Sequence, residues 1–294
     1  MVGRNRIKIL AGHRWSHTSP PVGSGVRRAF RIAYDGTAYR GFQRQPHAET
    51  VENELFAALA ALEVTAEPTA PAGYSAAGRT DAGVSAVGQT VAFDAPEWLT
   101  PAALNGSLPA DVRAWASADA PDDFHAQYDA TARTYEYHLH APEADTERAT
   151  AVLDRLSGRH DFHNLPRDDD GTERDLTASC ERDGSFLVCT FTADGFPRAF
   201  VRRAVGLVAS VATGERDIEF VDRVLSAEPL DGPDGVGAAA PEPLLLRRVD
   251  YDIEFTLDES AAASAWTVFE ERRISRLTGA RVAERLRSGA SRNP

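Results

Sequence analysis

The run Ala77-Gly78-Arg79-Thr80-Asp81-Ala82-Gly83-Val84-Ser85-Ala86-Val87-Gly88-Gln89, followed by Thr90-Val91-Ala92-Phe93, places one carboxylate between glycines and beside an arginine. Glycines let the backbone turn where a side chain would clash, so Asp81 can project into a cleft. Arg79 can hold that carboxylate in its ionised form. An aspartate in a glycine-rich loop is also a common turn or cap residue. The run alone therefore leaves two interpretations open, a turn and a displayed nucleophile.

Seven further segments accompany this run along the chain. They are Tyr34 to Pro46, Thr50 to Glu52, Asn105 to Val112, Asp122 to Ala126, Ala132 to Tyr137, Phe196 to Gly206 and Leu244 to Tyr251. Together with the Asp81 run and in the same order, they resemble the signature segments of the tRNA pseudouridine synthase A (TruA) family. The resemblance covers about residues 29 to 255. Ordered agreement of this kind is far more specific than a single motif.

Hydrophobic periodicity predicts alternating strands and helices in both halves of the chain. The first half has strand patterns at 28–34 and 91–93 around a helix pattern at 52–62. The second half has strand patterns at 133–140 and 186–192 and helix patterns at 149–156 and 200–213. We therefore predict an α+β protein. The resemblance implies two similar α/β domains that share a mixed, largely antiparallel sheet, with a central active-site cleft.

The predicted organisation has four parts. Residues 1–28 form a basic extension without regular structure, and residues 256–294 form a helical basic C-terminal extension. Between them lie an N-terminal synthase domain at 29–115 and a C-terminal synthase domain at 116–255.

The resemblance assigns three catalytic candidates. Asp81 matches the family's nucleophile, and Arg202 matches an arginine that pairs with it and keeps it ionised. Tyr135 matches a tyrosine that stacks on the flipped uracil and removes a proton from C5. From the residues alone, Tyr135 can equally be a half-buried strand tyrosine, and either matched arginine, Arg202 or Arg79, can be a phosphate contact.

Substrate contacts follow from the same resemblance. Arg79 matches a residue implicated in displacing the target nucleotide, Leu244 is expected to line the uracil pocket, and Gln43 and Arg44 lie in a loop expected to touch RNA. Leu244 can also be an ordinary core leucine. Tyr137, on the same strand as Tyr135, is expected to be a core residue.

The implied reaction turns uridine into pseudouridine in the anticodon stem-loop of tRNA, at about positions 38 to 40. Relatives act as homodimers without a metal, and a redox-neutral isomerisation requires no cofactor. A catalytically silent tRNA-binding paralogue is the alternative. An aspartate-dependent glycosidase is disfavoured, because that chemistry normally needs a second carboxylate as general acid and no partner for Asp81 in that role is identified in the signature loops.

Composition fits an intracellular protein in a salt-rich medium. The net charge is −12 and the isoelectric point about 5.2, which is unusual for a protein that binds RNA. Lys8 is the only lysine, while Asp and Glu number 44. Such acid-rich, lysine-poor chains suit molar salt, where charges are screened within a few ångströms; we therefore hypothesise a halophilic source. Two cysteines and no long apolar run argue against a disulfide framework and a membrane span, and predict a cytoplasmic protein.

The C-terminal extension carries a helical pattern. Asp258 can cap the helix, and Trp266, Phe269, Arg273 and Leu277 recur on one face. Basic residues dominate beyond Glu271. We expect a helix packed on the body; contact with tRNA or with a second subunit is the alternative. The chain also departs from the family pattern at Ser85, Arg198 and Ala199.

Overall fold

The computed structural model describes residues 25–165, 171–230 and 235–290. Most of the predicted N-terminal extension, residues 1–28, lies outside the described residues. The exception is its end, because the first strand already begins at Val26.

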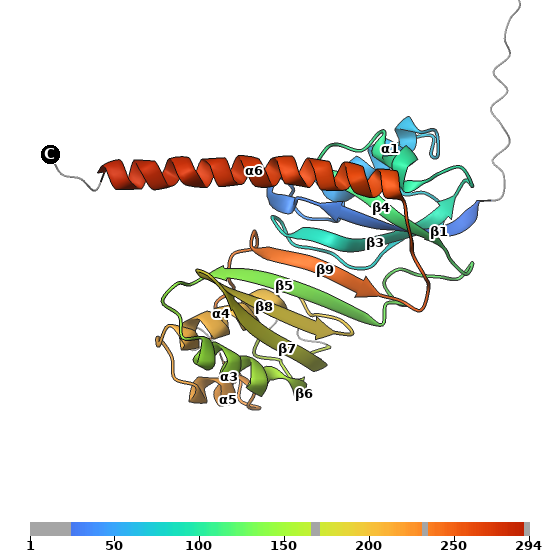
Figure 1. Cartoon of the computed structure of the whole chain (residues 1–294). Coiled ribbons are helices and arrows are strands. Elements are labelled where there is room, and N and C mark those ends of the chain that lie inside the picture. The colour runs from blue at the N-terminus through green and yellow to red at the C-terminus, as the bar shows by residue number, and fades with distance from the viewer. Residues whose placement is uncertain (1–24, 166–170, 231–234, 291–294) are drawn as a thin grey trace, which may run out of the picture.

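One sheet organises the molecule, and its strands follow the order β10-β4-β1-β3-β9-β5-β8-β7-β6, with β2 paired to β3 (Figure 1). In chain order the strands are β1 (Val26–Tyr34), β2 (Ser75–Ala76), β3 (Ser85–Ala95), β4 (Val112–Asp119), β5 (Ala132–His140), β6 (Gly158–Asp161), β7 (Glu173–Asp183), β8 (Phe186–Ala193), β9 (Leu244–Asp250) and β10 (Thr256–Leu257). Among the described residues, every pairing is antiparallel except that of β3 with β9, where Ser85 lies opposite Leu245. The predicted α+β class and the mixed, largely antiparallel sheet are confirmed.

The parallel pair β3–β9 joins the two halves of the molecule. Strand β9 comes from the end of the synthase region, yet it lies between β3 of the first half and β5 of the second. Strand β4 runs from Val112 to Asp119 and pairs with β1, so it crosses the boundary predicted at residue 115 and belongs wholly to the first half. The four-part division stays a prediction, with this strand as a guide to where the halves meet.

The helices lie mainly on one face of the sheet. They are α1 (Val51–Ala61), α2 (Pro101–Asn105), α3 (Thr146–Leu156), α4 (Phe200–Ala212), α5 (Glu219–Val224) and α6 (Glu259–Ala290), with a short 3₁₀ turn, η1 (Gly36–Ala38). The predicted patterns agree with these bounds to within about three residues, except that the strand predicted at 91–93 is the C-terminal part of β3, which begins six residues earlier at Ser85.

Alternation along the strands explains the two faces. Phe30, Ile32 and Tyr34 of β1 are buried against α1, whereas Ala29 packs on the opposite face with Phe124. A second core forms where α3 and α4 cover β5, β7 and β8. Tyr135 of β5 touches both cores. The helix-covered face of the sheet therefore carries one large apolar core in each half, with Tyr135 at their junction.

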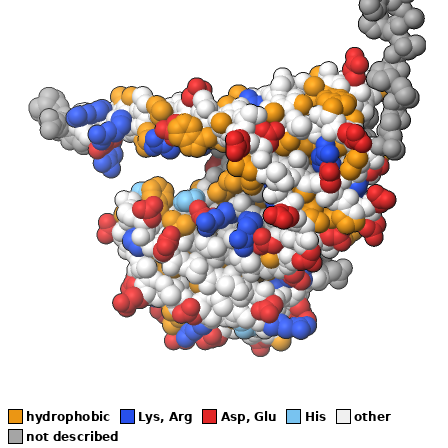
Figure 2. Space-filling view, turned by 45° about the vertical axis from the view of Figure 1, so that its right-hand side comes forward, with side chains coloured by type: hydrophobic (Ala, Val, Ile, Leu, Met, Phe, Trp, Pro, Cys, Tyr) orange, Lys and Arg blue, Asp and Glu red, His pale blue; other side chains and the backbone are white. Residues whose placement is uncertain are grey.

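Helix α6 lies on the other face. The Asp258 carboxylate accepts a hydrogen bond of 3.0 Å from the backbone N–H of Ala261, which confirms the predicted cap. The first turns pack on β4, where Ala261 and Ala265 are buried. The later turns project beyond the first half as an arm that bears apolar and basic side chains (Figures 1 and 2). Leu286, for example, is 70% exposed. The prediction of a helix packed on the body thus holds for the first part of α6 only.

Candidate active site

Asp81 lies in the loop between β2 and β3, where the two halves meet. The backbone N–H of Val84 donates to the Asp81 carbonyl over 3.1 Å, which closes a tight turn around this residue. The loop is held on both sides of the turn: Phe42 N–H donates to Thr80 O at 3.1 Å, and Gly83 N–H donates to Tyr39 O at 3.2 Å. The Asp81 side chain remains 35% exposed. The loop therefore displays the carboxylate while its backbone is fixed.

Buried and half-buried polar side chains fix the start of the same loop. The Tyr34 hydroxyl lies 2.8 Å from Thr80 Oγ1, and Gln89 Nε2 donates to Gly78 O over 3.0 Å. Arg133 Nη2 donates to Ala77 O over 2.9 Å. Gln89 and Tyr34 are almost fully buried, so these bonds replace water in a site where an unpaired polar group would cost about 1–3 kcal/mol.

Sequence reasoning did not identify Tyr34, Gln89 or Arg133 as supports of the loop. Each stands inside a quoted segment, Gln89 at the end of the Asp81 run and Arg133 two residues before Tyr135. The available clue was a polar residue within an otherwise apolar strand, since such a residue needs a partner once it is buried.

Arg202 brings a guanidinium from the second half to Asp81. Arg202 Nη1 lies 3.1 Å from Asp81 Oδ2, and the two side chains are 20% and 35% exposed. The Arg202 Nε donates to Ala239 O over 2.8 Å, and Ala239 N–H donates back to Arg202 O over 2.9 Å. The arginine is thus oriented by a second segment and does not depend on the ion pair alone.

Helix α4 places Arg202 by packing. Val201, Val205 and Val208 are buried in the second core. Gly206 allows the segment before β9 to approach the helix, because a Cβ at this position would lie 2.1 Å from Gly237 O. The polar side of the helix is then left to face Asp81.

Tyr135 lies on β5, between Leu246 of β9 and Phe191 of β8. Its ring meets Phe196 edge to face, with centroids 5.3 Å apart. Burial raises the pKa of the phenol to about 12; the positive charge of Arg133 opposes this shift and the negative charge of Asp81 adds to it. The phenol is therefore protonated at neutral pH, and its ring is held by apolar neighbours beside the carboxylate.

Leu244 of β9, predicted to line the uracil pocket, and Tyr137 of β5, predicted to be a core residue, are both buried. Leu244 is 6% exposed and lies opposite Tyr137, which is 2% exposed. Tyr137 is thus a core residue, as predicted. Leu244 packs in the same core, and its contact with a uracil stays a prediction.

The remaining predicted contacts lie farther out. Arg79 is exposed, and Gln43 is half-buried next to Phe42. Arg44 points to another partner, since its Nη1 donates to Pro68 O over 2.9 Å. The structure therefore brings Asp81, Arg202 and Tyr135 together, whereas Arg44 is engaged elsewhere.

Two of the departures from the family pattern have local roles. Ser85 Oγ accepts a hydrogen bond of 3.0 Å from the backbone N–H of Gly36. Ala199 precedes α4 with φ of 60°, in the left-handed region that residues other than glycine rarely adopt. Both residues flank the site without touching the Asp81 carboxylate through a hydrogen bond.

Two kinds of feature are absent from the part of the chain that the structure describes. No group of three or more His, Cys, Asp or Glu side chains there is arranged to hold a metal ion. Within the same residues, no helix combines the length and apolar character needed to cross a bilayer.

Comparison with known proteins gives a consistent picture. A family model described as tRNA pseudouridine synthase matches residues 31–129 and 152–252. A protein of Natronomonas pharaonis named tRNA pseudouridine synthase A is 62% identical over 262 residues, which span 88% of this chain and 98% of the relative. Proteins of the same name from Haloarcula marismortui and Methanosarcina acetivorans are 54% and 34% identical, each over 89% of this chain and 99% and 98% of the relative.

Proposed function

The chain belongs to the tRNA pseudouridine synthase family, and we propose that it isomerises uridines of the anticodon stem-loop, at about positions 38 to 40, with Asp81 as the nucleophile. The enzyme is thus an isomerase that acts on tRNA. The observation that carries the proposal is the partly exposed Asp81 carboxylate with one oxygen 3.1 Å from the Arg202 guanidinium, at the junction of the two halves.

The isomerisation needs a carboxylate that is ionised and directed at the target nucleotide. Its oxygen attacks either C6 of the base or C1′ of the ribose, and the C1′–N1 bond breaks. The uracil then rotates, C5 bonds to C1′, and the hydrogen on C5 leaves as a proton. Arg202 leaves the second carboxylate oxygen free for attack, since only Oδ2 is engaged by its Nη1. If Asp81 attacked C1′, C5 displaces the carboxylate as the C5–C1′ bond forms; if it attacked C6, the C6–O bond breaks afterwards by elimination. Either route regenerates the Asp81 carboxylate.

Tyr135 is the acceptor proposed for the C5 proton. Because the phenol is protonated in the resting enzyme, its oxygen takes up the C5 proton as its own hydrogen is released toward N1 of the uracil, which has lost its bond to C1′ and needs one proton. The proton lost from C5 therefore balances the proton gained at N1. Its ring, fixed edge to face against Phe196, offers an apolar surface for the flipped base. Extrusion of a base costs a few kcal/mol, which stacking on such a surface offsets.

Binding of RNA by an acidic chain is the second part of the proposal. Relatives from Natronomonas and Haloarcula fit the hypothesis of a salt-rich cytoplasm, in which counterion release adds little to affinity. Shape, stacking and hydrogen bonds then dominate, and Arg79 and Gln43 are the contacts we propose near the base. We also propose a homodimer, a cytoplasmic location, and a reaction without cofactor or metal.

The test uses purified protein in molar potassium chloride and tRNA transcripts that carry uridine tritiated at C5. We expect tritium release, and pseudouridine mapped by carbodiimide modification and primer extension in the anticodon stem-loop. Tritium release with pseudouridine mapped to another arm of the tRNA would overturn the proposed position in the substrate, while the proposed reaction would stand. Tight tRNA binding without release would identify a catalytically silent paralogue.

A further inference from the structure

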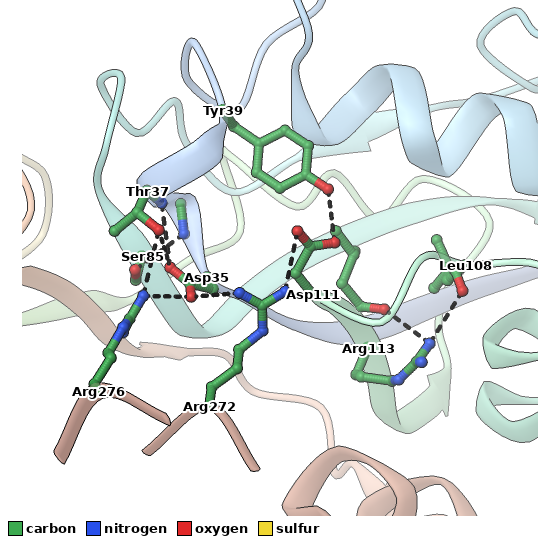
Figure 3. A network of polar contacts seen from close by, with 11 residues as sticks. Asp35, Thr37, Tyr39, Ser85, Leu108, Asp111, Arg113, Arg272 and Arg276 are labelled. Carbon is green, nitrogen blue, oxygen red and sulfur yellow. Dashed lines mark hydrogen bonds and ion pairs between the residues drawn. The ribbon is translucent and has the colours of Figure 1, made fainter. Parts of the chain in front are cut away.

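Two arginines of α6 reach into the first half and meet on one buried carboxylate (Figure 3). Arg272 Nη1 lies 2.9 Å from Asp35 Oδ2, and Arg276 Nη2 lies 2.5 Å from the same oxygen. The Asp35 side chain is only 5% exposed. These contacts join residues more than 230 positions apart in the sequence.

Asp35 also organises the loop that follows β1. Its other oxygen, Oδ1, accepts hydrogen bonds from Thr37 N at 3.2 Å and from Thr37 Oγ1 at 2.7 Å. Arg272 Nη2 also lies 3.4 Å from Asp111, whose Oδ1 accepts a hydrogen bond of 2.9 Å from the Tyr39 hydroxyl. The helix is thereby tied to both ends of the turn η1.

The segment from Gly36 to Phe42 in turn forms backbone hydrogen bonds with the Asp81 loop on both sides of Asp81. Phe42 N–H binds Thr80 O, and Gly83 N–H binds Tyr39 O, with the distances given above. Gly36 packs so closely on Val84 that a Cβ would lie 2.0 Å from the Val84 carbonyl oxygen. A displacement of Asp35 is therefore passed to the residues on both sides of the nucleophile.

We propose that Arg272 and Arg276 are positioning residues for the isomerisation: by neutralising and anchoring Asp35 from the far face of the sheet, α6 fixes the aim of Asp81. The inference rests on the proposed function of Asp81. The C-terminal helix then acts on the chemical step through the loop from Gly36 to Phe42, although it lies on the face of the sheet opposite α1 and α4.

Electrostatics explains why the buried Asp35 carboxylate needs both arginines. A buried carboxylate that loses its partners is destabilised far more than an exposed one. Burial raises the pKa of Asp35, but the hydrogen bonds from Thr37 and Arg276 outweigh it, so the pKa lies below its usual value. Without the two arginines, the carboxylate must draw in water or take up a proton, and either change loosens the turn at Thr37.

The test compares the Arg272→Gln/Arg276→Gln double variant with Arg281→Gln. Arg281 lies farther along α6, is 84% exposed and pairs with Glu284, three residues later. For the double variant we expect kcat to fall at least about tenfold while KM for tRNA stays within about twofold, because aim is lost and binding is not. The control should match the parent in both constants.

Two further measurements separate positioning from a structural role. The Arg272→Lys/Arg276→Lys variant keeps both charges and should recover part of kcat. Addition of Asp35→Asn to the double glutamine variant removes the buried charge, so it should restore the melting temperature without restoring kcat. A lower melting temperature with an unchanged kcat would overturn the proposal, as would a raised KM with an unchanged kcat, which would show that the arginines bind RNA.

Amide hydrogen exchange tests the same inference without catalysis. In the double variant, exchange of the peptide that spans residues 78–85 should be faster, whereas Arg281→Gln should leave it unchanged. Unchanged exchange of this peptide in the double variant would overturn the proposal that Arg272 and Arg276 hold the Asp81 loop in place, even if the enzyme were active. Faster exchange in a protein whose parent lacks activity would instead support the anchor and reject the proposed function.

Discussion

Asp81 and Arg202 face each other across the junction of the two halves, but they are held by different forces. The aspartate loop is fixed by buried and partly buried hydrogen bonds from Tyr34, Gln89 and Arg133. The arginine stands on α4, whose apolar side packs against Phe162 and the other residues of the second core. We call the Asp81 loop with its hydrogen-bonding supports the aspartate wall, and α4 with the core beneath it the arginine wall. In each wall one glycine allows two segments to approach closely, Gly36 against Val84 and Gly206 against Gly237.

The difference has consequences for how each wall responds to change. A buried polar network no longer holds its groups in a fixed geometry when one partner is missing, because the other partner is left without a hydrogen bond. Apolar packing loses stability in proportion to the volume removed. We therefore expect damage to the aspartate wall to appear mainly in kcat and damage to the arginine wall mainly in the free energy of unfolding.

The largest effect on stability should come from Phe200→Ala. Phe200 is 1% exposed and packs edge to face on Phe162, with centroids 5.0 Å apart. The substitution should lower the free energy of unfolding by about 3–5 kcal/mol, measured by denaturant titration in molar salt. Phe186→Ala is the control, because Phe186 is 40% exposed and its loss should cost less than about 1 kcal/mol. If Phe200→Ala abolished kcat in the folded protein without loss of stability, the distinction between the walls would fail.

Gly36→Ala should have the next largest effect and should act on both properties. The new Cβ would lie 2.0 Å from Val84 O, so the catalytic loop must move. We expect a loss of about 1–3 kcal/mol in stability and a clear fall in kcat. Gly78→Ala is the matched control at the other end of the loop, since nothing lies within 4 Å of its Cβ position. Equal activity of the two variants would show that the loop tolerates displacement.

A smaller effect should depend on pH. The folded-state pKa of Asp35 is below its ordinary value of 3.8, so its contribution to stability is present above that value and is lost as pH falls through the lowered pKa. The stability gap between the parent and Arg272→Gln/Arg276→Gln should therefore be full near neutrality and should narrow in acid. Denaturant titrations from neutral pH to below 4 would measure it, and a gap that widens in acid would contradict the assigned role of Asp35.

The smallest effect, of opposite sign, should come from Ala199→Gly at the start of α4. Ala199 has φ of 60°, which costs a residue with a side chain about 1 kcal/mol relative to glycine. We expect a gain of up to about 1 kcal/mol, whereas Ala209→Gly inside α4 should lose about 1 kcal/mol. Differential scanning calorimetry would show the two melting temperatures moving apart. A loss in both variants would mean that the Ala199 methyl group packs favourably.

The sequence predicted the elements that depend on local pattern. The alternation in residues 28–34, the helical spacing at 52–62 and the glycine-rich run around Asp81 each depend on neighbours in the chain, and the structure contains β1, α1 and the loop accordingly. The prediction that Arg202 meets Asp81 came from family resemblance, and the two side chains do form an ion pair.

The rest could not be predicted because it depends on contacts between distant segments. Nothing in the sequence near Asp35 announces Arg276, which lies 241 positions later. The helical pattern of the C-terminal extension predicted a packed helix, but only the fold shows that α6 covers β4 and then leaves the body. A pattern of residues predicts that a face will be buried and does not specify the surface that buries it.

The central claim is that Asp81, and no other group, begins the reaction. The direct measurement is tritium release from tRNA by Asp81→Asn under single-turnover conditions, beside Asp122→Asn, which alters an exposed acidic residue outside the loop. The amide keeps the shape of the side chain and lacks its nucleophilicity, so Asp81→Asn should bind tRNA with nearly parental affinity and release no tritium, while Asp122→Asn behaves as the parent. Release by Asp81→Asn at more than a trace, in a sample free of parental enzyme, would contradict the account.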